Sequence, residues 1–256
     1  MKDIDIFFKE KPLKMICLGF SSGLPILLVF STLSVWLIQA GINRSTVTLF
    51  SWAGFAYAFK YLWSPLVDNY KLPFLKKLGH RKSWLLTSQI LIIIALILTA
   101  FTDPQNNLFF TALFISLLAF FSATQDILVD AFRIESAPQS LQGPMSSMYI
   151  AGYRIAMLVA GAGSLWLAAL FGTEIYNQEV WKKVYLAMSS FMLIGIFATI
   201  SSNEPKIKRN LKTKNHLQFL FAVFFSVVGF IFLYSIIDNP FDKKDIFLTF
   251  LFSIIR

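Results

Sequence analysis

Five polar side chains that suit proton and ion-pair chemistry lie within one otherwise apolar stretch. The stretch reads FFSATQDILVDAFRIE, and the five residues are Gln125, Asp126, Asp130, Arg133 and Glu135. Residues three and four apart share a helix face, so Asp126, Asp130 and Arg133 lie on one face. A carboxylate at membrane depth is costly and must face protein or water rather than lipid. This face therefore points into a helix bundle or an aqueous cavity, and Asp126 is a candidate functional residue.

Two interpretations are open for the end of this stretch. Asp130, Arg133 and Glu135 can belong to the same interior site, or they can mark the end of the helix at the lipid headgroups. Asp126 lies nearer the apolar run, which favours a function or a buried ion pair. A helix movement that brings Asp126 next to Asp130 in one state and next to an arginine in another would load and release a proton. The candidate arginines are Arg133 and Arg154.

The composition identifies an integral membrane protein. Of the 256 residues, 56% are hydrophobic and 14% are charged, whereas a soluble domain has about 45–50% and about 25%. One globular core of this size cannot bury the excess. The net charge of +9 falls between apolar segments, which indicates membrane orientation rather than nucleic acid binding.

Apolar segments of the ~20 residues that a membrane helix needs recur along the chain. They cover residues 15–38, 46–66, 84–102, 108–130, 145–171, 182–201 and 217–237. An eighth, 246–255, is too short to cross the bilayer alone. We therefore predict an all-α polytopic membrane protein with a six-helix bundle at 1–201, a basic loop at 202–216, and a seventh span with an incomplete eighth segment at 217–256. The first six spans divide into three and three, as in inverted repeats.

Basic residues gather in alternate loops, which predicts the orientation. They occur in the N-terminal arm, after the second span and in the 202–216 loop, whereas the loop after the third span has none. Because excess Lys and Arg mark the cytoplasmic side, the N-terminus is expected there. The apolar run after Lys14 continues to about Ile38, so it is an uncleaved span rather than a signal peptide.

Polar and small residues in other spans complete the pattern. Lys60 can reach the headgroups or pair inside the bundle. Arg154, inside the fifth span, needs a carboxylate, a phosphate headgroup or an anionic substrate, and Asp126, Asp130 or Glu135 could supply the carboxylate. Small residues every four positions let the fifth span approach a neighbour closely; they are Gly152, Ala156, Ala160, Ser164, Ala168 and Gly172.

Four stretches together resemble AmpG-type muropeptide permeases of the major facilitator superfamily. They are FSSGLP at 20–25, FSWAGFAYAFKYLWSPLVD at 50–68, AFFSATQDILVDAFRIE at 119–135 and GYRIAMLVAGAGSLWL at 152–167. The resemblance implies the N-terminal six-helix bundle of such a transporter plus about one further span. It also implies proton-coupled import of anhydro-muropeptides across the inner membrane, with a glycopeptide, protons and lipid as partners.

The resemblance assigns roles to the polar residues. The set that matches the family's polar core is Gln125, Asp126, Asp130, Arg133 and Arg154. The gating or ion-pair candidates are Lys60, Asp68, Arg81 and Glu135. Asp68 followed by Gly79 and the basic pair Arg81–Lys82 resembles, in a lengthened form, a loop signature that latches cytoplasmic helix ends in that family.

Alternatives remain open at this stage. The family pattern needs a second bundle, and LYSIID at 233–238 stands where the family has LYKLGD, so we expect a truncated or split chain, and a second chain could complete the transporter. The rivals are a transporter of another anionic solute such as acetyl-CoA, whose transporters share the ATQD-like segment, and a nonfunctional remnant. No G-x-S-x-G or H-E-x-x-H occurs, and one cysteine with two histidines provides no metal cluster. Neither an enzyme nor a cofactor is expected.

Overall fold

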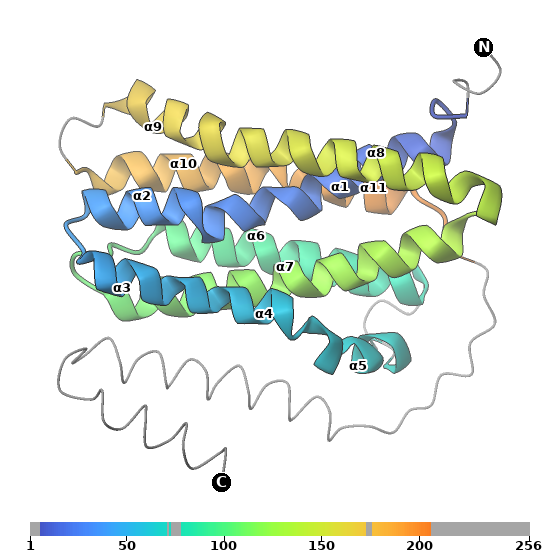
Figure 1. Cartoon of the computed structure of the whole chain (residues 1–256), viewed down its shortest axis with the longest axis horizontal. Coiled ribbons are helices and arrows are strands. Elements are labelled where there is room, and N and C mark those ends of the chain that lie inside the picture. Colours follow the sequence, from blue (N-terminus) through green and yellow to red (C-terminus); the bar gives the residue numbers. More distant parts are fainter. Residues whose placement is uncertain (1–5, 71, 73–77, 173–175, 206–256) are drawn as a thin grey trace, which may run out of the picture.

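The part of the chain that the structure describes folds into six rows of helix that run alongside one another (Figure 1). The computed structural model describes residues 6–70, 72, 78–172 and 176–205. Every regular element within those residues is a helix. The seventh predicted span, the final apolar segment and most of the 202–216 loop lie outside the described residues.

Five of the rows are long and apolar enough to cross a membrane, which confirms the all-α membrane class. Their helices are α1 (Glu10–Val29) with α2 (Ser31–Gln39), α6 (His80–Ala100), α7 (Leu108–Ser136), α8 (Gln139–Leu158) with the π-helical η4 (Val159–Gly163) and α9 (Ser164–Phe171), and α10 (Gln178–Phe191) with α11 (Leu193–Ser201).

The second row differs from the single helix expected over 46–66. It consists of α3 (Arg44–Leu49), η1 (Phe50–Ala53), α4 (Gly54–Ala58), η2 (Lys60–Leu62) and α5 (Ser64–Asn69). Phe59 (φ −98°, ψ 11°) and Trp63 (φ −105°, ψ −2°) depart from regular helical dihedrals. Pro65 stands in the first turn of α5, where its missing N–H costs no hydrogen bond. The helical pattern is therefore interrupted on both sides of Lys60.

The small residues of the fifth predicted span do pack on a neighbour. A Cβ added at Gly152 would collide with the backbone carbonyl of Ile16, and a Cβ at Gly19 would collide with that of Tyr149. Further along, Thr32 Oγ1 of α2 donates to the Ala160 carbonyl oxygen at 2.8 Å. We call this contact of α8 and α9 with α1 and α2 the glycine seam. Gly172 lies outside it, because it ends α9 with φ 94°.

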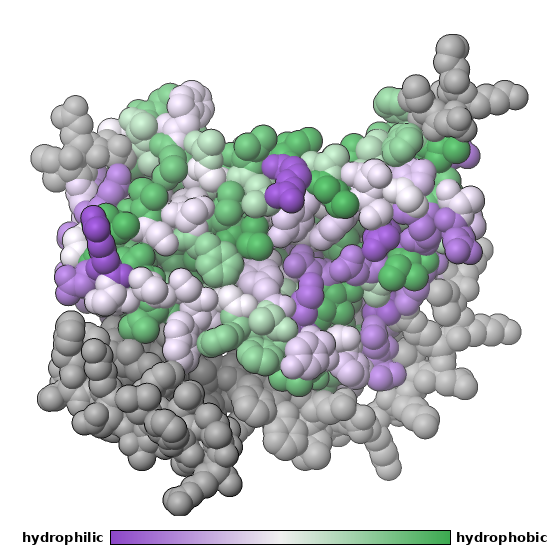
Figure 2. Space-filling view, viewed as in Figure 1, coloured by the Kyte–Doolittle hydropathy of each residue, from purple (hydrophilic) through white to green (hydrophobic). Residues whose placement is uncertain are grey.

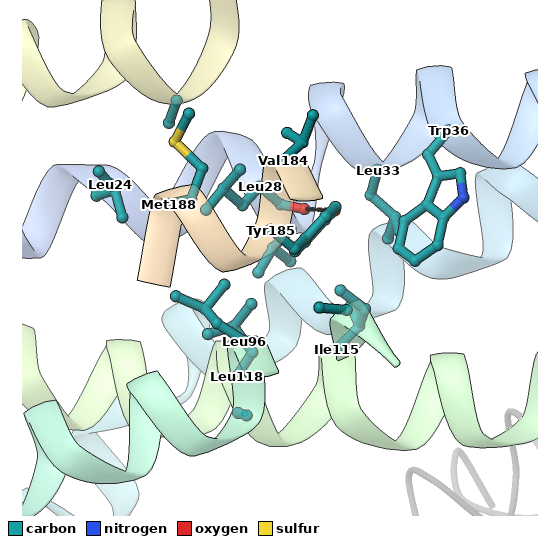
Figure 3. Packing of buried hydrophobic residues seen from close by; sticks show 14 of the residues in the cluster. Leu24, Leu28, Leu33, Trp36, Leu96, Ile115, Leu118, Val184, Tyr185 and Met188 are labelled. Carbon is teal, nitrogen blue, oxygen red and sulfur yellow. Dashed lines mark hydrogen bonds between the residues drawn. The ribbon is translucent and has the colours of Figure 1, made fainter. Parts of the chain in front are cut away.

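Large apolar side chains from α1, α2, α6, α7 and α10 form the main core (Figure 3). Trp36 stacks on Trp181 with ring centroids 5.8 Å apart, and its ring lies 5.0 Å from that of Tyr185. The Tyr185 hydroxyl donates to the Leu28 carbonyl oxygen at 2.9 Å, so the hydroxyl hydrogen of Tyr185 has a partner in the core. This core fixes the axial position of α10 against α1.

Apolar side chains also cover the outside of the bundle. In Figure 2 hydrophobic residues are spread across the visible face, whereas most strongly hydrophilic residues gather toward its left and right ends. Exposed members include Ile155, Leu158, Trp166 and Phe197. Such a surface is stable against lipid and not against water.

Candidate functional site

Asp126 lies inside the bundle, on the buried face of α7. Its residue is 8% exposed, and its Oδ2 lies 3.9 Å from Lys60 Nζ of η2. Of the two roles open to Lys60, the structure therefore places it against a buried carboxylate. The separation exceeds a hydrogen-bond length, and the Lys60 side chain is 36% exposed, so the pair is loose. Asp126 Oδ1 is buried and makes no hydrogen bond within the described part of the chain.

Gln125 extends this polar interior toward α1. It is fully buried, and its Nε2 donates to Ser21 Oγ at 3.1 Å and to Ser22 Oγ at 3.2 Å. The hydroxyl oxygens of Ser122 and Tyr57 are buried as well. The two serines were not among the predicted site residues, although a Ser-Ser pair inside an apolar span is a usable signal.

Asp130 and Arg133 form a separate pair near the end of α7. Arg133 Nη2 lies 3.5 Å from Asp130 Oδ1, and the Asp130 side chain is 49% exposed. An exposed pair of this kind contributes little to stability. The geometry supports the headgroup interpretation for these two residues rather than a place beside Asp126.

Arg154 does not meet the carboxylates that were expected to pair with it. It is exposed on α8, its Nη1 lies 3.8 Å from Met157 Sδ, and it forms no ion pair with any residue described by the structure. The physical reason is helix geometry. Gly152 faces α1, and a residue two positions along a helix points about 200° away from it.

A second polar group, the charged cluster, joins three helix ends around Arg81. Arg81 Nη1 donates to Asp68 Oδ1 at 2.6 Å. Its Nε and Nη2 donate to the two carboxylate oxygens of Glu135 at 3.0 and 2.8 Å. Arg81 is only 4% exposed, and such a cation needs this pairing. The separation between Asp68 and Gly79 in the sequence thus does not keep these gating candidates apart.

The site residues therefore divide into two groups. Asp126, Gln125 and Lys60 lie together in the bundle interior, whereas Asp68, Arg81 and Glu135 link helix ends. The interior group can exchange a proton or a counter-ion at Asp126, because a buried carboxylate with a loose cation can accept either. The charged cluster can hold α5, α6 and α7 together, or release them.

Comparison with known proteins agrees with the resemblance seen in the sequence. Residues 15–255 match the model of the Major Facilitator Superfamily. The chain is 37% identical over 200 residues to the anhydromuropeptide permease of Escherichia coli K12, which covers 78% of this chain and 39% of the permease. It is 35% identical over 253 residues to a Rickettsia felis protein named as transporter AmpG 4, covering 98% of this chain and 56% of that protein.

The chain spans about half the length of the curated relatives it matches. The two relatives described above are named as a transporter and a permease, which agrees with the expectation that this chain is not an enzyme. The rows of membrane-spanning helix and the family match lead to one conclusion: the chain belongs to the major facilitator superfamily of membrane transporters.

Proposed function

We propose that this chain forms the proton-binding part of an inner-membrane importer of anhydro-muropeptides. The observation that carries the proposal is Asp126, a buried carboxylate on a membrane-spanning helix that is loosely paired with Lys60. A carboxylate at this depth is a functional candidate by default. The similarity to the E. coli anhydromuropeptide permease supports the choice of substrate over acetyl-CoA.

In the proposed cycle a proton takes the place of Lys60 at Asp126, and the substrate takes the place of Asp126 at Lys60. A proton that binds Asp126 neutralises the carboxylate and frees Lys60, whose side chain is the more accessible of the two. Lys60 then attracts a lactyl or peptide carboxylate of the substrate. Release of the substrate on the other side returns Lys60 to Asp126, which loses its proton. Gln125 and the Ser21–Ser22 pair supply neutral hydrogen-bonding groups beside this exchange.

We further propose that the end bearing the charged cluster is cytoplasmic, together with the N-terminus. Lys11 and Lys14, at the start of α1, donate to the Ser136 and Ser201 carbonyl oxygens at this end. Arg81 and Lys82 begin α6 there as well. The excess of basic residues supports this orientation.

A second bundle, from another segment or another chain, is proposed to cover α8 and α9. In the most apolar part of the Gln139–Phe171 row 22% of the residues are buried, compared with 67% in the most apolar part of Glu10–Gln39. Together with the half-length coverage of the relatives, this exposure supports a face that packs against further protein. Arg154 would then meet that bundle.

The test is uptake of labelled anhydro-muropeptide by cells that lack their own permease and express this chain. We expect uptake that collapses with an uncoupler and that excess acetyl-CoA does not compete. Asp126→Asn should abolish it, because the amide cannot carry a proton. Asp130→Asn is the matched control, since Asp130 is half exposed and paired on its own helix. Full uptake by Asp126→Asn, with equal amounts of protein in the membrane, would contradict the assignment.

A further inference from the structure

Glu204 lies just after α11 and binds the beginning of another helix. Its Oε1 accepts the Arg81 backbone N–H at 2.8 Å, and its Oε2 accepts the Lys82 backbone N–H at 3.0 Å. The first N–H groups of a helix have no partner within the helix, and the helix dipole favours a negative charge there. A carboxylate from residue 204 therefore caps α6, more than 100 residues away in the sequence.

Lys82, at the start of α6, in turn binds the end of α11. Its Nζ donates to the Ile200 carbonyl oxygen at 3.0 Å, in the last turn of α11, and the residue is only 9% exposed. Carbonyl groups at a helix C-terminus lack partners, and the dipole favours a cation there. Each of the two helices thus caps the other, with an acid at the N-terminus of α6 and a base at the C-terminus of α11. We call this arrangement the reciprocal cap.

Gly79 leaves room for the reciprocal cap. It precedes α6 with φ 95°, a conformation that residues with a side chain rarely adopt. A Cβ at this position would collide with the Glu204 side chain and lie 2.7 Å from its Oε2. The backbone conformation favours glycine, and a larger residue would also have to push the Glu204 side chain away from the α6 N-terminus.

The reciprocal cap and the charged cluster share one residue. The backbone of Arg81 is held by Glu204, while its side chain reaches Asp68 and Glu135. A buried Arg that spans two carboxylates needs its main chain held in place, because its planar group bonds only in a narrow geometry.

We propose that Glu204 is the positioning residue for Arg81, and that the reciprocal cap makes α6 and α11 move as one unit. This inference concerns how the helix ends move, so it does not depend on the identity of the substrate or of the coupling ion.

Hydrogen–deuterium exchange of the full chain in lipid nanodiscs tests the inference. With Glu204→Ala we expect the Arg81 and Lys82 amides to exchange about 10-fold faster or more, since hydrogen bonds to a charged group are among the stronger ones. Glu204→Gln should give an intermediate rate, because its amide oxygen still accepts one bond. The expected change spreads to the peptides that contain Asp68 and Glu135, which lose a well-placed Arg81.

The distribution of the change separates positioning from general stability. The peptide around Asp103, at the other end of α6, should keep its exchange rate in both variants. Glu179→Gln is the matched control, because Glu179 pairs with Lys182 on its own helix at that other end. Unchanged exchange at Arg81 and Lys82, or equal acceleration at both ends of α6, would overturn the proposal. If Glu204→Ala fails to fold, Glu204→Gln alone decides between these outcomes.

Discussion

The two ends of the bundle are held together by different chemistry. At one end, Arg81 joins α5, α6 and α7 through ion pairs with Asp68 and Glu135. At the other, the contacts between rows are mostly neutral. Trp181 Nε1 donates to Gln39 Oε1 at 2.9 Å, and Gln178 Nε2 donates to the Ala100 and Thr102 carbonyl oxygens at 3.2 Å.

This difference separates a switchable end from a fixed one. A cluster of charges changes its arrangement when a proton, an ion or another charge arrives, because each interaction is strong and depends on its partners. Neutral hydrogen bonds of side chains to backbone carbonyls respond weakly to such events. We therefore expect helix movement at the charged end, with the opposite end as the hinge.

Substitution of Arg81 should cause the largest loss of unfolding free energy, and it tests whether the two ends differ. Arg81→Ala removes the buried cation that pairs with Glu135 and Asp68, and loss of one partner of a buried pair costs about 3–5 kcal/mol of unfolding free energy. Denaturant unfolding in detergent micelles measures the loss. Glu179→Ala, which removes an exposed pair at the other end, should cost no more than about 1 kcal/mol. Equal losses would show that the ends do not differ.

Substitution of alanine for two glycines with positive φ should give the next largest difference in unfolding free energy between the ends. Gly79→Ala combines a strained backbone with a collision against Glu204, so we expect a loss of about 1–3 kcal/mol in unfolding free energy. Gly41→Ala, at the opposite end, carries the strain of φ 76° with nothing within 4 Å of the new Cβ, so its loss should be smaller. Gly143→Ala has neither penalty and is the control. A Gly41 variant as unstable as the Gly79 variant would refute the role given to Glu204.

The smallest effect is expected at the opposite end, from Tyr176. Its hydroxyl donates to Asp103 Oδ1 at 2.6 Å, and Tyr176→Phe should cost about 1 kcal/mol of unfolding free energy. Burial, and then the hydrogen bond to Asp103, raise the pKa of Tyr176 above its usual range. A raised folded-state pKa gives a contribution that is complete below the unfolded value of about 10 and is lost as the pH rises through the folded value. The difference in unfolding free energy between the unmodified protein and Tyr176→Phe should therefore be constant up to about pH 10 and become smaller above it.

Much of the architecture could be predicted, because it depends on local patterns. A helix must be apolar over about 20 residues to cross the bilayer, so the spans can be found from the sequence. Small residues four apart, as from Gly152 to Ala168, are typical of closely packed membrane helices. The interior place of Asp126 could also be predicted, since a carboxylate in an apolar run has few other solutions. The grouping of Asp68 with Arg81 was expected from the resemblance and not from spacing.

What could not be predicted depends on partners that are distant in sequence. Nothing near Glu204 indicates that it caps α6, because its partners are Arg81 and Lys82. The outward direction of Arg154 follows only once Gly152 is known to face α1. The breaks around Lys60 have only Pro65 as a local signal, and that signal explains only the start of α5.

The glycine seam has a mechanical consequence. At Gly19, Gly23 and Gly152 one backbone lies directly against another, without interlocking side chains between the two helices. Interlocked side chains must leave one set of holes and enter the next before a helix can shift along its axis. The backbone contacts at these glycines have no such steps, so a shift along the axis has to break mainly the hydrogen bonds of Thr32 to Ala160 and Ser164. The first row of helices can thus shift along the fifth row while the two stay in contact.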